Sequence, residues 1–235
     1  MNLSLFEAKP VSVTRHQTFD RVALEVFMAE NPGVRTFEGC TFDVGDFSRM
    51  DLRGCQFVHC TLAEASWYAA DLSQTQWTGC RGRQADFESA SMTDAKFVNC
   101  DLNNTKWRRA KLSSASFKGC KLTGAHFVEV AALGLGFEDC LLVGTDLRGM
   151  SFRKAQLTEL NFSDADLSGC DFREAVFSGG SLRNAHTKLT RFDGADLRET
   201  DIAGLKVLDA KLFKNALISP RQAADLLRAW ELIVA

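Results

Sequence analysis

Large apolar side chains recur at every fifth residue from Phe37 to Leu217. Of the 37 positions in this series, only Gly82, Ala132 and Thr187 lack a large apolar side chain, and no insertion is evident in the spacing. An interval of five drifts around a helix of 3.6 residues per turn and builds no stable apolar stripe, so the pattern excludes an α-helical repeat. It indicates a solenoid whose unit is five residues long.

A second inward position lies two residues before each large residue, which we call residue i. Position i−2 is mostly Ala, Cys, Thr or Gly. Because side chains alternate along a strand, i−2 and i face the same way. The next inward residue comes three positions after i, so i+1 and i+2 must turn a corner. Glycine is concentrated at i+2, where a turn benefits from unrestricted φ.

The cysteines indicate how many corners close a coil, because six of them recur every twenty residues: Cys40, Cys60, Cys80, Cys100, Cys120 and Cys140. Twenty residues are four pentads, so four corners return the chain above its start, at an inter-strand spacing of about 4.8 Å. The sequence therefore predicts an all-β fold, a right-handed quadrilateral parallel β-helix of about nine coils. We expect the cysteines to pack as small buried hydrophobes, not as a metal or redox array.

Several pentads carry a more specific pattern, in which Asp precedes the large residue: Ala70-Asp71-Leu72-Ser73, Cys100-Asp101-Leu102-Asn103, Ala165-Asp166-Leu167-Ser168-Gly169, Cys170-Asp171-Phe172-Arg173 and Ala195-Asp196-Leu197-Arg198. These pentads resemble the A(D/N)LXX consensus of the pentapeptide repeat family. The tail from Ile218 to Leu227 is similar to the C-terminal dimerisation helix of Qnr-type quinolone-resistance proteins.

The Qnr resemblance implies a homodimeric, DNA-mimicking binding protein. Its partners would be DNA gyrase or topoisomerase IV, which it would protect from quinolones or topoisomerase-poisoning toxins. Many Qnr proteins carry two projecting loops that break the five-residue frame, and none is obvious in this chain. The alternative is a pentapeptide-repeat interaction scaffold for an unrelated protein partner.

Three segments follow from the pattern: an N-terminal cap in residues 1–34, the β-helix in residues 35–217, and a C-terminal dimerisation helix and tail in residues 218–235. Within residues 18–31, apolar side chains at helical spacing predict a short capping helix. An imperfect first coil remains open, because two of them also fit the five-residue frame. The apolar stripe consists of Phe19, Val22, Ala23, Val26 and Phe27.

At the C-terminal end, Ser219 is suited to be a helix N-cap and Pro220 to be the first helical residue. The tail offers more apolar surface than one coil edge can cover, so we expect an isologous dimer. A helix folded over its own last coil is the alternative. The expected dimer-interface residues are Ala223, Leu226, Leu227, Trp230, Leu232 and Ile233.

Aspartate recurs at the outward position i−1, where carboxylates follow one another at multiples of the coil spacing. They could imitate the phosphates of DNA toward a basic groove, or they could bond to the neighbouring backbone. The C-terminal coils would lie near the centre of the dimer. The expected topoisomerase-binding residues are therefore Asp146, Asp166, Asp171, Asp193, Asp196, Glu199 and Asp201.

Composition narrows the function further. The net charge is −2, so no basic tail indicates direct nucleic-acid binding. Neither a signal peptide nor a membrane-length apolar run is visible, which favours a cytoplasmic protein. The four histidines lack metal-ligand spacing, and the common catalytic motifs are missing, so we expect no cofactor, no metal and no enzymatic activity.

Two features depart from a uniformly acidic rod. Between Lys106 and Lys121 the chain carries six cations and no acidic residue, which would suit either an acidic partner surface or solubility: Lys106, Arg108, Arg109, Lys111, Lys118 and Lys121. The frame defects at 81–83 and 131–136 are where a bulge, a kink or a projecting loop could form.

Overall fold

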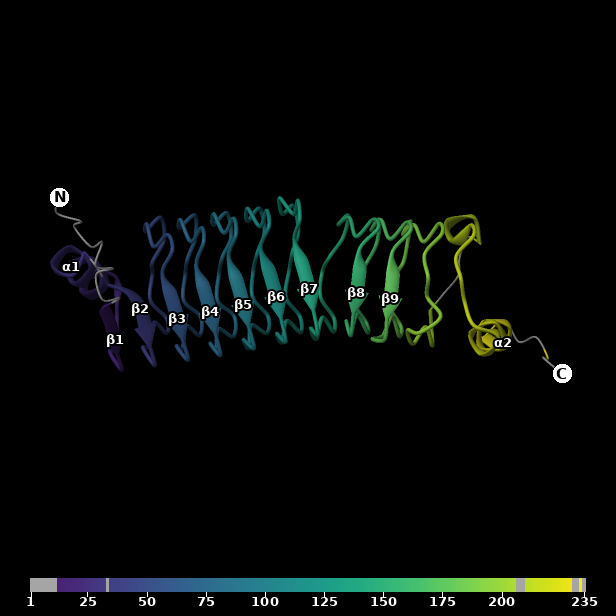
Figure 1. The fold of residues 1–235 in the computed structure, drawn as a ribbon, viewed down its shortest axis with the longest axis horizontal. Coiled ribbons are helices and arrows are strands. Elements are labelled where there is room, and N and C mark those ends of the chain that lie inside the picture. Colours follow the sequence, from purple (N-terminus) through teal and green to yellow (C-terminus); the bar gives the residue numbers. More distant parts are fainter. Residues whose placement is uncertain (1–11, 33, 206–209, 230–232, 234–235) are drawn as a thin grey trace, which may run out of the picture.

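The computed structural model describes residues 12–32, 34–205, 210–229 and 233. These residues form a rod-shaped parallel β-solenoid with a helix at each end (Figure 1). The predicted right-handed quadrilateral β-helix is confirmed. It has about eight turns rather than nine, because the regular pentads stop short of Leu217 at the C-terminal end.

Each coil has four faces, which we call A, B, C and D after their first central residues Phe37, Phe42, Phe47 and Leu52. Face A carries the longest pairing, and partner residues in neighbouring coils are 20 positions apart, as in Phe37 and Phe57. β1 (Ser12–Arg15) pairs with the first strand of this face. The strands of face A are β2 (Val34–Glu38), β3 (Gln56–Val58), β4 (Gln76–Thr78), β5 (Lys96–Val98), β6 (Ser116–Lys118), β7 (Gly136–Glu138), β8 (Gln156–Thr158) and β9 (Val176–Ser178).

The interior is filled by columns of side chains that stack from coil to coil. On face A, the rings of Phe57 and Trp77 are 3.9 Å apart and nearly parallel. The six cysteines from Cys40 to Cys140 form a column of their own, and each thiol donates to a carbonyl of the preceding coil. The Sγ of Cys60 lies 3.3 Å from the oxygen of Phe37, and Cys80 repeats the contact with Phe57. The predicted vertical stacking of the cysteines is therefore confirmed.

The backbone is left-handed at position i+2 of most corners, in glycine and other residues alike. Gly54 has a φ of 68° and Arg49 a φ of 62°. An L-residue in this region costs about 1–2 kcal/mol, so the solenoid's pairing must hold these corners in place. The prediction that i+2 turns the corner is correct, although glycine fills only part of these positions.

The N-terminal cap combines the two predicted alternatives. Phe19 stacks on Phe42 at 5.5 Å and so belongs to a partial first coil. The chain then enters α1 (Arg21–Glu30), whose N-cap Asp20 accepts a hydrogen bond from the backbone N–H of Ala23 at 2.8 Å.

The predicted inward stripe of this helix is partly wrong. Val22 and Val26 are exposed, whereas Leu24 is fully buried and Phe27 and Met28 pack against the core. Because α1 begins at Arg21, these three residues at spacings of three and four form the face that covers the first coil.

The C-terminal end contains a one-residue frame shift that the sequence pattern did not reveal. Leu217 was predicted to point inward, but it bridges the outward Asp196 and is half exposed. Phe213, not Leu212, continues a core column, because its ring stacks on that of Phe192 at 4.8 Å. A 3-10 helix at Ala210–Phe213 belongs to this irregular last turn.

The two frame defects have different outcomes. The pentad of Gly82 is regular, and Arg81 bridges both Thr61 below and Asp101 above. The side chains of Leu62 and Leu102 approach Gly82 closely enough to fill the missing volume. At residues 131–136, by contrast, the inter-coil pairing is interrupted, and no projecting loop replaces it in this described segment.

Candidate partner-binding surface

Four of the ten aspartates at the outward position i−1 are held by an arginine two residues later. In the DLR pentad of Asp146, the Nε of Arg148 donates to one carboxylate oxygen at 2.8 Å and Nη2 donates to the other at 2.6 Å. The same two-bond arrangement, which we call an Asp-X-Arg clip, recurs in three further pairs: Asp51 with Arg53, Asp171 with Arg173, and Asp196 with Arg198. The hydrogen bond from aspartate to the neighbouring backbone, which was the alternative expectation, is also present: Asp171 accepts from the backbone N–H of Arg173 at 3.1 Å.

The arginine side-chain hydrogen bonds hold the pKa of the clipped carboxyls below the ordinary value. This applies to Asp51, Asp146, Asp171 and Asp196. These four aspartates therefore remain ionised, but their charge is compensated within the molecule.

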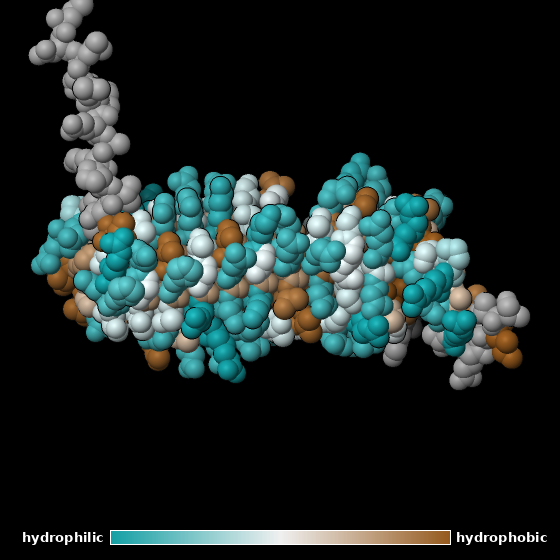
Figure 2. All heavy atoms as spheres, turned by 60° about the horizontal axis from the view of Figure 1, so that its bottom comes forward, coloured by the Kyte–Doolittle hydropathy of each residue, from teal (hydrophilic) through white to brown (hydrophobic). Residues whose placement is uncertain are grey.

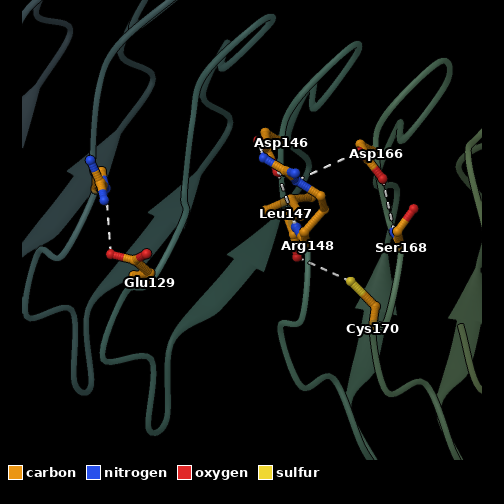
Figure 3. A network of polar contacts seen from close by, with 8 residues as sticks. Glu129, Asp146, Leu147, Arg148, Asp166, Ser168 and Cys170 are labelled. Atoms are coloured by element: carbon orange, nitrogen blue, oxygen red, sulfur yellow. Dashed lines mark hydrogen bonds and ion pairs between the residues drawn. The ribbon is translucent and has the colours of Figure 1, made fainter. Parts of the chain in front are cut away.

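Figure 3 shows how a clip connects neighbouring coils on face C. Arg148 lies between Asp146 of its own coil and Asp166 of the next, whose carboxylate is 3.6 Å from the Nε of Arg148. The other carboxylate oxygen of Asp166 accepts a hydrogen bond from the backbone N–H of Ser168 at 3.0 Å. To the left in the figure, toward the N-terminal coils, Glu129 pairs with Arg108 of the preceding coil. Carboxylate and guanidinium groups therefore alternate along this face, and the carboxylates are not left without counter-charges.

The structure distributes the seven predicted binding residues over all four faces. Asp146 and Asp166 lie on face C, Asp171 and Asp193 on face D, Asp196 on face A, Glu199 at the corner between A and B, and Asp201 on face B. Asp193 pairs with Arg191 at 3.3 Å and Asp201 with Arg183 at 2.8 Å. Of the seven, only Glu199 has no ion pair among the described residues.

A line of unpaired carboxylates at the corner between faces A and B was missed by the sequence reasoning. Asp139, Glu159 and Glu199 all occupy position i+2, are exposed, and make no ion pair within the described part of the chain. Asp139 and Glu159 lie in consecutive coils. A search of position i+2, and not only of i−1, would have found them.

The basic band between Lys106 and Lys121 is largely neutralised by neighbouring coils. Its ion pairs are Lys106 with Asp86 at 3.8 Å, Arg108 with Glu129 at 3.4 Å, Arg109 with Glu88, and Lys118 with Glu138 at 2.7 Å. The band runs around the coil across all four faces instead of gathering on one. This placement favours charge balance over a single cationic docking surface.

The C-terminal helix α2 (Pro220–Ala229) is docked on the end of the solenoid. Ser219 and Gln222 form a reciprocal cap, since the N–H of Gln222 donates to Ser219 Oγ at 3.3 Å and the N–H of Ser219 to Gln222 Oε1 at 2.6 Å. The same Gln222 donates to the carbonyls of Leu197 and Thr200 in the last complete coil.

The predicted dimer residues therefore divide into two groups. Leu226 is partly buried against the core of its own chain, and Ala223 is half-buried. Leu227 is exposed, and Ile233 is 97% exposed. Trp230 and Leu232 lie outside the described residues. The helix thus covers its own last coil with one side and leaves Leu227 open on another.

The remaining chemistry is sparse. The eight thiols are buried, and burial raises the pKa of Cys55 to about 11 and that of Cys170 to about 12. The described part of the chain contains no cluster of three or more His, Cys, Asp or Glu side chains suited to a metal ion. Nor does any helix in this part have the length and apolar character needed to cross a membrane. The face shown in Figure 2 is mainly hydrophilic, with small separate hydrophobic spots.

A stacked, four-faced coil with a five-residue unit defines a parallel β-solenoid repeat protein. The family profile of the pentapeptide repeat region matches residues 35–107, 50–127 and 110–192. The chain therefore belongs to the pentapeptide repeat family. No curated protein matches its sequence.

Solved structures with the same fold include QnrB1, described as a plasmid-mediated fluoroquinolone resistance protein. Full-length QnrB1 superposes with a TM-score of 0.70 at 17% identity, covering 94% of this chain and 100% of QnrB1. A trypsin-treated form gives a TM-score of 0.71 at 20% identity, covering 83% of this chain and 97% of that chain. At these identities, the likeness establishes the shared fold.

Proposed function

We propose that this chain is a Qnr-like, non-enzymatic binding protein that engages a type II topoisomerase and protects it from quinolones or topoisomerase-poisoning toxins. The observation that carries the proposal is the superposition on full-length QnrB1 over 94% of the chain. The docked C-terminal helix, which the tail sequence suggested, adds to this support. Carboxylates on the outside of the rod would replace DNA phosphates in a basic groove.

The ion pairs indicate which carboxylates are available to bind a partner. A clipped aspartate must leave its arginine before it can bind a lysine or arginine of the partner, whereas Asp139, Glu159 and Glu199 are free to do so. We therefore place these three corner carboxylates at the centre of the contact. The other six predicted residues would contribute through the surface potential of the C-terminal coils.

The test is a supercoiling assay with purified gyrase and a fluoroquinolone. Two triple variants remove the same number of charges: Asp139→Asn with Glu159→Gln and Glu199→Gln, and Asp146→Asn with Asp171→Asn and Asp196→Asn. We expect the wild type to restore supercoiling, the corner variant to lose most of this effect, and the clip variant to retain most of it. Neither rescue nor inhibition by the wild type over a wide concentration range would refute the topoisomerase proposal.

We also propose that two copies associate through the C-terminal end. Besides Leu227 and Ile233, this end has an apolar cavity of about 250 Å³ suited to a side chain of the partner copy. Its lining is Leu197, Ile202, Leu205, Phe213, Ala216, Ile218 and Leu226.

Light scattering tests this dimer. Leu227→Asp should yield a monomer, because it places a charge in an apolar interface. Arg221→Asp, on the same helix and also exposed, is the matched control and should remain dimeric. A monomeric wild type would remove the dimer from the proposal and leave the supercoiling test unaffected.

A further inference from the structure

The backbone pairing of the solenoid is interrupted at one place on two faces. On face D, Leu112 donates to Ala131 at 2.8 Å and Ser114 donates to Leu133 at 2.8 Å. The regular bonds resume one coil later, where Phe152 donates to Asp171 at 2.8 Å. In between, neither Ala132 nor Gly134 donates to the following coil within the described structure.

On face A, the pairing between the same two coils is interrupted at the end that adjoins face D. Strands β1 to β7 form one sheet and β8 and β9 another. Figure 1 shows the wider separation of β7 and β8 compared with the other neighbouring strands. A single hydrogen bond, from the N–H of Asp139 to the oxygen of Thr158 at 3.1 Å, joins the two coils at the far end of this face.

Faces B and C remain paired through the same coils. On face B, Leu141 bridges both Lys121 and Asn161, and on face C, Asp146 bridges both His126 and Asp166. Faces D and A share one corner of the square, and faces B and C share the opposite one. The pairing is therefore interrupted only at the corner between faces D and A, and it is intact at the opposite corner between faces B and C.

The side chains explain where the break lies. Ala132 occupies a central position that Leu112 and Phe152 fill in the neighbouring coils, so volume is missing from the column of face D. Leu133 points outward and is 85% exposed, so it does not fill the gap.

The aromatic columns also end at this level. The stack of face A runs from Phe37 to Phe137, and a new stack on face D begins with Phe152 on Phe172 at 4.9 Å. Between the two stacks, Phe137 and Phe152 make a tilted contact at 6.4 Å. Neither backbone nor ring stacking therefore holds the D/A corner closed.

We propose that this corner is a hinge that divides the rod into two rigid solenoid segments, one before Gly136 and one after Ser151. Bending about the bonded strip at faces B and C opens and closes the D/A corner with little loss of native contacts. Motions of packed units about a few hinge residues are a general mode of conformational change. Such a hinge lets a long rod adapt its curvature to a partner, and it does not depend on which partner that is.

Amide hydrogen exchange provides the first test. We expect the amides of Ala132 and Gly134 to exchange roughly 100-fold faster than those of Leu112 and Ser114, which occupy the same positions one coil earlier. Equal protection at the two levels would overturn the proposal.

Pairs of spin labels provide the second test and distinguish a hinge from a static gap. Ser73 and Arg173 lie on face D five coils apart, about 24 Å at the spacing of neighbouring strands, and their connection crosses the open corner. Ala63 and Ser163 are separated by the same number of residues along the bonded face B. The native thiols are buried, so cysteines introduced at these surface positions are labelled selectively.

We expect a broad distance distribution for the face D pair and a narrow one for the face B pair. Equally narrow distributions would refute the hinge. Ala132→Leu, which fills the column, should narrow the face D distribution and slow the exchange of Gly134. Ala131→Leu adds the same atoms at the adjacent exposed position and should change neither. An unchanged distribution in Ala132→Leu would contradict the assignment of the hinge to the volume missing at Ala132.

Discussion

The side-chain amide of Gln222 lies 2.7 Å from the carbonyl oxygen of Leu197 and donates a hydrogen bond to it. The same nitrogen is 2.8 Å from the oxygen of Thr200. The last coil of a solenoid has carbonyls with no further coil to pair with, and leaving such groups buried without a partner is costly. One glutamine thus replaces part of the missing coil and fixes α2 in place.

Replacement of Gln222 by Ala should loosen α2 from the solenoid. It removes both hydrogen bonds to the last coil and the reciprocal cap with Ser219, so we expect a loss of about 1–3 kcal/mol in local stability. Hydrogen exchange or limited proteolysis of α2 measures this loss. Arg221→Ala, on the adjacent exposed position, is the control and should behave as the wild type. Equal protection of α2 in both variants would contradict the role assigned to Gln222.

Gly180→Ala should destabilise the fold more than Gly144→Ala. Both glycines have a left-handed backbone, with φ of 72° and 62°, so both substitutions pay about 1–2 kcal/mol for this conformation. At Gly180 an added Cβ would also collide with the backbone carbonyl of Leu160, whereas at Gly144 it would meet no atom within 4 Å. The collision should add about 1–3 kcal/mol. Urea denaturation compares the two variants, and equal midpoints would refute the argument.

The Asp-X-Arg clips should make stability depend on pH in the acidic range. The pKa of Asp146 and Asp171 is lowered in the folded protein, chiefly by the hydrogen bonds from Arg148 and Arg173. A lowered folded-state pKa stabilises the protein above the ordinary value of about 3.9, and this contribution is lost as the pH falls through the folded-state pKa. We expect a modest slope because the clips lie at the surface.

Urea midpoints between about pH 5 and pH 3 measure this slope. Asp146→Asn combined with Asp171→Asn should flatten it, because the titrating groups are gone. Arg148→Gln combined with Arg173→Gln should flatten it as well, because the carboxyl pKa then returns toward its ordinary value. A slope that is the same in all three proteins would show that the clips do not contribute.

The solenoid could be predicted from the sequence because every pentad repeats the same spacing of inward residues. The positions of Phe37 and Phe57 follow from the interval of twenty residues, and their pairing is found as expected. The shift that brings Phe213 into the column of Phe192 could not be predicted, because Leu212 is also apolar and fits the regular frame. Where two neighbouring residues can both fill the core, the period no longer specifies which one does.

The candidate surface was harder to predict, because the position of a carboxylate in the repeat does not show whether a neighbouring arginine neutralises it. Asp171 and Asp201 were correctly expected to point outward, but each is paired with an arginine that the search for carboxylates ignored. The Asp-X-Arg spacing was visible in the sequence, since residues two apart on a strand share a face. The pairing of Asp201 with Arg183 links different coils and requires the register of the solenoid.

The indole of Trp67 shows one polar group that the core leaves unsatisfied. Two other tryptophans are preceded by threonine at position i−2, and in each case the hydroxyl accepts from the indole: Trp77 Nε1 is 2.9 Å from Thr75 Oγ1, and Trp107 Nε1 is 2.8 Å from Thr105 Oγ1. Trp67 is preceded by Ala65 instead. Its Nε1 is buried and has no hydrogen-bond partner among the described residues.

Ala65→Thr should therefore stabilise the protein by about 1 kcal/mol, because it supplies the acceptor that the buried indole lacks. The column of face C accommodates a threonine in this position, since Thr105 and Thr145 are both fully buried and donate to a carbonyl three residues earlier. Thermal and urea unfolding measure the gain. Ala85→Thr is the matched control: it lies one coil above Ala65 but precedes Phe87, which has no N–H to satisfy, so it should not stabilise. A similar gain in both variants would mean that filling the column, and not the indole hydrogen bond, is responsible.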